Sequence, residues 1–173
     1  DGNKVAEDLA AGKIGIEFGE QWNSIWPLQM NVDNDPDAQW QAFPIVSDLT
    51  DTPTVPLKFR TSQFFAVRKD FEHPEAVVKM FNTFVEKNWG ETAEFDYYYA
   101  PPNAESVWQL SPVTPSPATK NLDAFRDIEA ARQANDFSTL EGEPKTIQEK
   151  LDMYYSGSEE GFALWGWERI YGT

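Results

Sequence analysis

The chain has 173 residues, with 29 acidic against 14 basic side chains and a formal net charge of -15. Such an acidic surface repels phosphate backbones, which argues against nucleic acid as a partner. The absence of cysteine from the sequence excludes disulfides, thiolate nucleophiles and sulfur-ligated metals. The length suits one domain or a part of a larger protein, and no apolar run reaches the roughly 18 residues of a membrane span.

The first part of the chain is expected to alternate strands with loops. Residues 4–11 carry the pattern of a helix that ends at Gly12, and residues 14–18 read as a short buried strand. We expect a short helix or turn at residues 22–26 and a polar loop at 31–39. Residues 39–46 and the end of 57–69 are predicted to be two further strands.

The second part of the chain is expected to be helical. The clearest helix covers residues 73–89, with Pro74 at its first position and one apolar stripe. Residues 91–119 should be irregular, and three helices are predicted over 121–135, 143–157 and 158–172. These elements predict an α/β fold class, with a small mixed sheet flanked by several helices. So small a sheet favours a fragment whose sheet partners lie elsewhere in a parent chain.

Acidic residues suggest two kinds of site. Asp33, Asp35 and Asp37 have the spacing of a calcium loop, but Ala38 and Pro44 stand where an EF-hand needs Gly and Glu. A weak calcium-binding turn therefore remains as the alternative to a solvated loop. A pair of carboxylates could also serve a glycoside hydrolase, and the acids near aromatic residues are Glu17, Glu20, Asp96 and Glu105.

Aromatic residues indicate a binding site more strongly than the acidic residues do. Trp22 and Trp26 are four residues apart and would share one face of a helical turn, and Tyr97 begins a run of three tyrosines. Flat rings beside carboxylates, amides and an arginine suit a polyol, because the ring covers the C–H face of a sugar while polar groups bind its hydroxyls. The alternative is that most of these rings belong to the core.

Several motifs in the first half of the chain resemble one family. They are "GKIGIEFGEQW", "WQAFPIV" and "FFAVRKDFEHPEAVVKMFNTFVEKN", followed by "GFALWGWERIYG" near the end. In this order they are similar to the extracellular solute-binding proteins of bacterial ABC transporters, the sugar-binding class that includes maltose-binding protein. Lipoprotein members from Gram-positive bacteria are the most similar. The resemblance covers residues 5–88 and continues beyond residue 90 only in the order of elements.

The resemblance implies a two-lobed, type II periplasmic-binding-protein-like fold. Residues 1–173 would then be one compact fragment, mostly the C-terminal lobe, with a segment at about 40–66 that crosses the hinge. The resemblance also implies a cell-surface lipoprotein outside the cell that binds carbohydrate, has no catalytic activity and no cofactor or metal, and passes its ligand to a membrane permease.

The ligand-binding residues are predicted in two ways. Trp22 matches a tryptophan that lies against the bound sugar in the family. Trp167 corresponds loosely to a late helix near the cleft. Trp26, Arg60 and Tyr97 are candidates on their chemistry alone. A carbohydrate-active hydrolase and a non-catalytic acidic interaction domain are the alternative functions.

Overall fold

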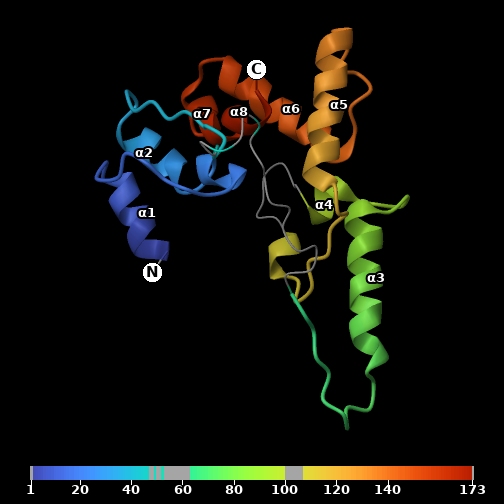
Figure 1. Cartoon of the computed structure of the whole chain (residues 1–173). Coiled ribbons are helices and arrows are strands. Elements are labelled where there is room, and N and C mark those ends of the chain that lie inside the picture. Colours follow the sequence, from blue (N-terminus) through green and yellow to red (C-terminus); the bar gives the residue numbers. More distant parts are fainter. Residues whose placement is uncertain (1, 47–48, 50–51, 53–62, 100–106, 173) are drawn as a thin grey trace. The chain divides into compact units, whose positions relative to one another are not determined.

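The computed structural model of the chain describes residues 2–46, 49, 52, 63–99 and 107–172 (Figure 1). These residues form helices and connecting segments, and none of them lies in a β-strand. The chain divides into two compact units. Unit 1 consists of Asp1–Pro56 with Ile147–Thr173, and unit 2 is Leu57–Thr146.

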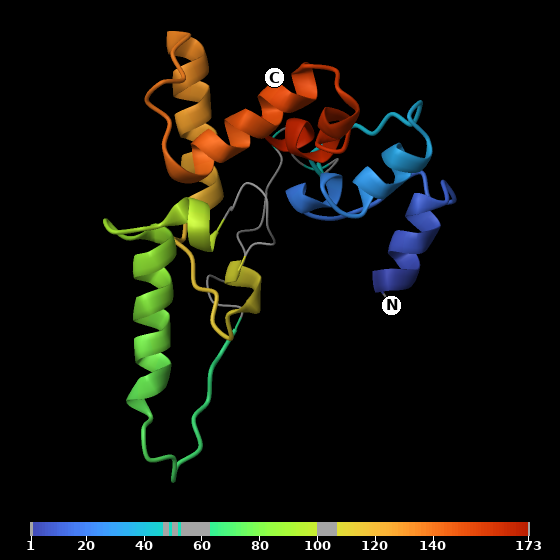
Figure 2. The same cartoon turned by 180° about the vertical axis from the view of Figure 1, so that it is seen from behind.

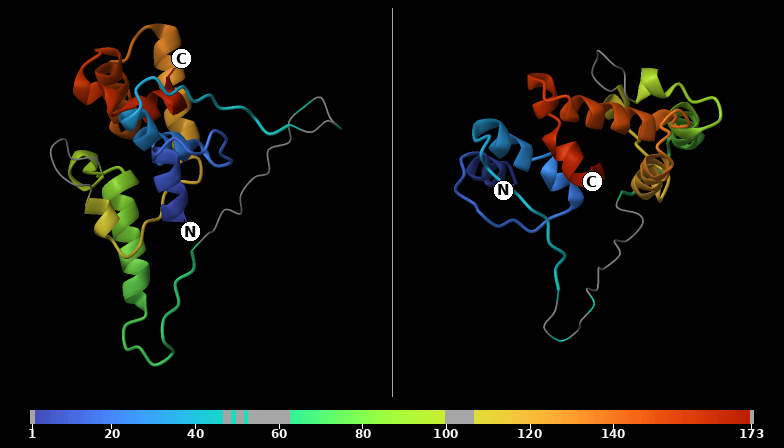
Figure 3. Two further views of the ribbon diagram at one scale, coloured as in Figure 1. Left: turned by 90° about the vertical axis from the view of Figure 1, so that its left-hand side faces the viewer. Right: turned by 90° about the horizontal axis from the view of Figure 1, so that it is seen from above.

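Unit 1 is built from both ends of the chain. Its N-terminal part holds helix α1 (Gly2–Ala10), the 3-10 helix η1 (Gln21–Ser24) and helix α2 (Leu28–Asn34). Its C-terminal part holds most of α6 (Gly142–Tyr155), then α7 (Glu159–Phe162) and α8 (Trp165–Tyr171). Helix α1 packs on α2, while α8 packs on α2 and η1 (Figure 3). The buried apolar residues are Ala6, Leu9, Val32, Ile147, Leu151, Trp165 and Tyr171.

Unit 2 contains the two longest helices, α3 (Glu75–Trp89) and α5 (Lys120–Ala134) (Figure 2). Between them lie the short helices α4 (Phe95–Tyr98) and η2 (Val107–Leu110), and α4 contacts both α3 and η2. The first turns of α6 complete the unit. Its buried apolar residues are Phe84, Val113, Ala124, Ile128, Ala131 and Leu140.

The predicted helices are confirmed, with adjusted ends. Helix α3 begins after Pro74 and ends before Gly90, and α5 ends at Asn135, which has the left-handed conformation that closes many helices. The predicted loop at 31–39 is partly wrong, because α2 continues to Asn34. The predicted last helix is divided into α7 and α8, and the side chain of Ser158 caps the first of them.

The predicted α/β fold with a small mixed sheet is wrong for the described part of the chain. Residues 14–18, 39–46 and 63–67 are not strands, and their backbones form no hydrogen bonds with described residues. A strand needs a neighbouring strand to pair its backbone groups. Several apolar side chains of these segments are instead exposed, as for Phe18 at 78%. Of the predicted hinge segment at about 40–66, residues 47–48, 50–51 and 53–62 lie outside the described residues.

Candidate functional site

Two exposed tryptophans stand on one short turn of unit 1. Trp22 lies in η1 and is 38% exposed, and Trp26 follows η1 and is 53% exposed. The carbonyl oxygen of Trp22 accepts hydrogen bonds from the backbone N–H groups of Ile25 and Trp26, both at 2.9 Å. The turn is therefore internally bonded, although both indole rings reach the surface. We call Trp22 and Trp26 the tryptophan pair.

The turn that carries the tryptophan pair is fixed to helix α8. Ser24 Oγ donates a hydrogen bond to the carbonyl oxygen of Gly166 at 2.8 Å. A Cβ atom on Gly166 would lie only 2.6 Å from the Cα of Ile25, so the two backbones touch. Glycine is needed at position 166 because no side chain fits between them.

The buried side chain of Gln29 joins helix α2 to the C-terminal helices. Its Oε1 accepts from the backbone N–H of Gly166 at 2.8 Å, and its Nε2 donates to the carbonyl of Phe162 at 3.2 Å and to Asp33 at 2.7 Å. These bonds satisfy backbone groups at the start of α8 and the end of α7. Helix α2 and the C-terminal helices are thus tied together beneath the tryptophan pair.

Trp167 also belongs to unit 1, but its ring is already in contact with other side chains. It lies in α8 and is half-buried. The ammonium of Lys150 is 3.6 Å from the ring centroid, and the ring of Tyr171 stacks on it at 6.2 Å. A ligand would compete with these contacts, so Trp167 is less accessible than the tryptophan pair.

Tyr97 belongs to unit 2 and is 65% exposed. Its ring meets that of Tyr98 edge-on at 4.7 Å. It lines an open hollow of about 530 Å³ whose polar side chains are Glu94, Asp96, Ser138, Glu141 and Lys145. The structure thus brings Trp22, Trp26 and Trp167 onto packed elements of one unit and places Tyr97 in the other. Arg60 lies outside the described residues.

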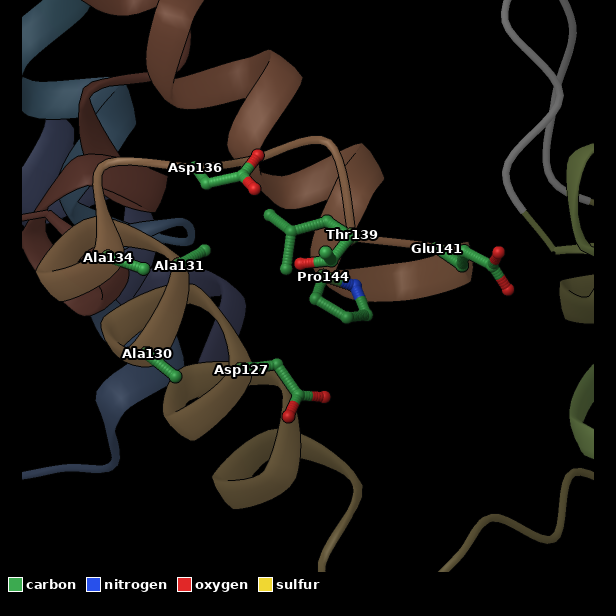
Figure 4. Close-up of a pocket in the computed structure, with 9 residues that line it drawn as sticks. Asp127, Ala130, Ala131, Ala134, Asp136, Thr139, Glu141 and Pro144 are labelled. Atoms are coloured by element: carbon green, nitrogen blue, oxygen red, sulfur yellow. The ribbon is translucent and has the colours of Figure 1, made fainter.

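A second hollow of unit 2, of about 510 Å³, lies between α5 and the segment that leads into α6 (Figure 4). Alanines of α5 form one wall, and Thr139, Leu140 and Pro144 line the opposite side. The carboxylates of Asp127, Asp136 and Glu141 lie apart from one another in Figure 4. Throughout the described ranges, no group of three or more acids or histidines is placed to hold a metal ion.

One acid beside this hollow has an altered proton affinity. The hydroxyl and the backbone N–H of Ser138 both donate to Oδ1 of Asp136, at 2.6 and 3.0 Å. These bonds stabilise the ionised carboxylate and lower the pKa of Asp136 below its ordinary value. The two bonds from Ser138 to Asp136 hold the loop that follows α5.

The acids considered for calcium lie in a polar turn, and those considered for hydrolysis are distributed over both units. Asp33 accepts from Gln29, and Asp35 accepts from the backbone N–H of Asp37 at 3.2 Å, as in an ordinary polar turn. Glu17 has one buried carboxylate oxygen without a hydrogen-bond partner among the described residues. Glu17 and Glu20 belong to unit 1, and Asp96 belongs to unit 2. Glu105 is outside the described residues.

A cluster in unit 2 that no sequence motif predicts joins Trp89, Tyr99, Lys120 and Glu143. Its members come from the end of α3, the residue after α4 and the starts of α5 and α6. Lys120 and Glu143 form an ion pair with side chains only 16% and 11% exposed. The only signal in the sequence was the run of aromatic residues around Tyr99.

Comparison of the chain with models of protein families, with curated proteins and with solved structures found no match. Among the described helices, none combines the length and the apolar character that crossing a membrane requires.

Proposed function

We propose that the chain is a non-catalytic carbohydrate-binding component, and that the tryptophan pair contacts the sugar. The observation that carries the proposal is the exposure of Trp22 and Trp26 on a turn that is bonded internally and fixed to α8. An exposed indole ring presents flat apolar surface that a ligand can cover.

A sugar suits this surface for two physical reasons. The indole face covers the C–H groups of a pyranose, and the indole N–H remains able to bond a hydroxyl. The turn is also held before the ligand arrives, so little conformational entropy is lost on binding. An oligosaccharide would use both rings, because successive sugar units present successive apolar faces.

The resemblance to sugar-type solute-binding proteins supports the same proposal. Trp22 is the residue that the resemblance assigns to the sugar, and "GKIGIEFGEQW" places it after the matching segment. In that role the chain would act outside the cell, at its surface, and deliver the bound sugar to an ABC transporter permease. The described residues form helices and no sheet. The proposal is therefore based on the motifs and on the two exposed rings.

A calorimetric titration against a panel of mono- and oligosaccharides tests the proposal. We expect saturable binding of at least one sugar by the unmodified chain, and clearly weaker binding by Trp22→Ala. Phe71→Ala is the matched control, because Phe71 is an exposed aromatic residue of unit 2. The assignment fails if no sugar binds, or if the Phe71 and Trp22 variants lose affinity equally.

The same mixtures decide between binding and hydrolysis. After long incubation, chromatography of the sugar should recover it unchanged. Shorter products that disappear with Glu17→Gln would contradict the non-catalytic assignment and favour the hydrolase alternative.

A further inference from the structure

Four aromatic rings gather in unit 2 around residue 99. The rings of Trp89 and Phe95 lie 4.8 Å from that of Tyr99, and Trp108 stacks on Tyr99 at 5.4 Å with an angle of 15° between the planes. The indole N–H of Trp89 donates to the carbonyl of Pro115 at 3.2 Å, which fixes the orientation of that ring. We call Trp89, Phe95, Tyr99 and Trp108 the ring cluster.

The ammonium group of the Lys120 side chain lies against this ring cluster. The Nζ of Lys120 lies 5.4 Å from the ring centroids of both Trp89 and Tyr99, within the distance of a cation–π interaction. It also donates to the hydroxyl oxygen of Tyr99 at 3.2 Å and forms the ion pair with Glu143. Aromatic rings, a hydroxyl and a carboxylate are groups with which proteins bind organic ammonium ions.

The position of Lys120 in its helix gives an independent reason to regard the cluster as selective for a cation. Lys120 is the first residue of the fifteen-residue helix α5. The helix dipole disfavours positive charge at this end. The ammonium is nevertheless held in a largely buried place, so the rings and Glu143 must outweigh the unfavourable dipole.

We propose that the ring cluster together with Glu143 is a binding site for small primary alkylammonium ions, and that the side chain of Lys120 occupies it from within the chain. The Lys120 side chain is an alkyl chain that ends in an ammonium group. We therefore expect ligands of the same kind, which are small primary alkylammonium ions. An external amine enters only when the Lys120 side chain leaves. The site lies in unit 2 and is independent of the sugar proposal, which concerns residues of unit 1.

Lys120→Ala removes three methylene groups and the ammonium, and n-propylammonium replaces them atom for atom. We expect calorimetry to show saturable binding of n-propylammonium to this variant. The unmodified chain and the double variant Lys120→Ala, Glu143→Gln should bind it at least about tenfold more weakly. The neutral control is 1-propanol, which has the same length but no charge.

If the Lys120→Ala variant is less stable, its stabilisation by an added amine can be used to measure binding. If that variant is partly unfolded, n-propylammonium should raise its melting temperature and its folded fraction, while 1-propanol and sodium chloride should not. Two results would overturn the proposal. One is that n-propylammonium neither binds nor stabilises Lys120→Ala, and the other is that 1-propanol acts equally well.

Discussion

Ser24 and Gly166 join two elements that are 142 residues apart in the sequence. The Ser24 hydroxyl donates to the Gly166 carbonyl at 2.8 Å, and the backbones touch where residue 166 has no side chain. This contact places the turn with the tryptophan pair on the surface of α8. The proposed sugar contact therefore depends on a junction that brings together both ends of the chain.

Gly166→Ala should destabilise the chain, because the added methyl group would meet the backbone of Ser24 and Ile25. Overpacking of this kind costs about 1–3 kcal/mol of unfolding free energy. Urea denaturation followed by circular dichroism measures the change. Gly15→Ala is the matched control, since nothing lies within 4 Å of a Cβ at that position. Equal stabilities of the two variants would contradict the close contact.

Gln29→Leu tests the polar connection beneath the turn. Leucine has a similar volume but cannot accept from the Gly166 N–H, which is left buried without its partner. Such a loss costs about 1–3 kcal/mol. Gln133→Leu on the exposed side of α5 serves as the control and should change stability by less than about 0.5 kcal/mol. A Gln29 variant as stable as the control would show that these hydrogen bonds do not hold α8.

The helices could be predicted from the sequence because their signals are local. Pro74, Gly90 and the apolar stripe between them mark α3 within a single stretch. The strands were predicted from alternation and from short apolar runs, and neither pattern says anything about a pairing partner. Phe18 alternates correctly but lies exposed in a segment whose backbone is unpaired among the described residues.

The candidate sites also combine local features, which could be predicted from the sequence, with contacts between distant segments, which could not. Trp22 and Trp26 could be recognised from their spacing, and both have exposed rings. Their junction with Gly166 could not be predicted, since it depends on a contact between distant segments. The same holds for Lys120 and Glu143, which are 23 residues apart and meet only through the packing of unit 2.

The stability of the chain should depend on pH through Asp136. Because hydrogen bonds from Ser138 lower the pKa of Asp136 in the folded state, this carboxylate stabilises the fold above its unfolded pKa. The contribution is lost as the pH falls through the lower, folded pKa. Ser138→Ala should move the pKa of Asp136 up towards its ordinary value, as measured by NMR titration of the carboxyl carbon.

Asp8 provides the internal control for this titration. Its pKa is lowered by hydrogen bonds from Lys4 and Lys13, and Ser138 is no part of that arrangement. The pKa of Asp8 should therefore be the same in both proteins. An unchanged pKa of Asp136 in Ser138→Ala would show that the loop hydrogen bonds do not govern its titration.

Calorimetric titration of the best-bound oligosaccharide with the unmodified chain and with the double variant Trp22→Ala, Trp26→Ala tests the central claim most directly. Neither tryptophan is among the buried core residues, so circular dichroism should show the double variant to be folded. We predict that its affinity for the sugar falls at least about tenfold, which corresponds to about 1.4 kcal/mol. An affinity equal to that of the unmodified chain would contradict the claim that the tryptophan pair binds carbohydrate.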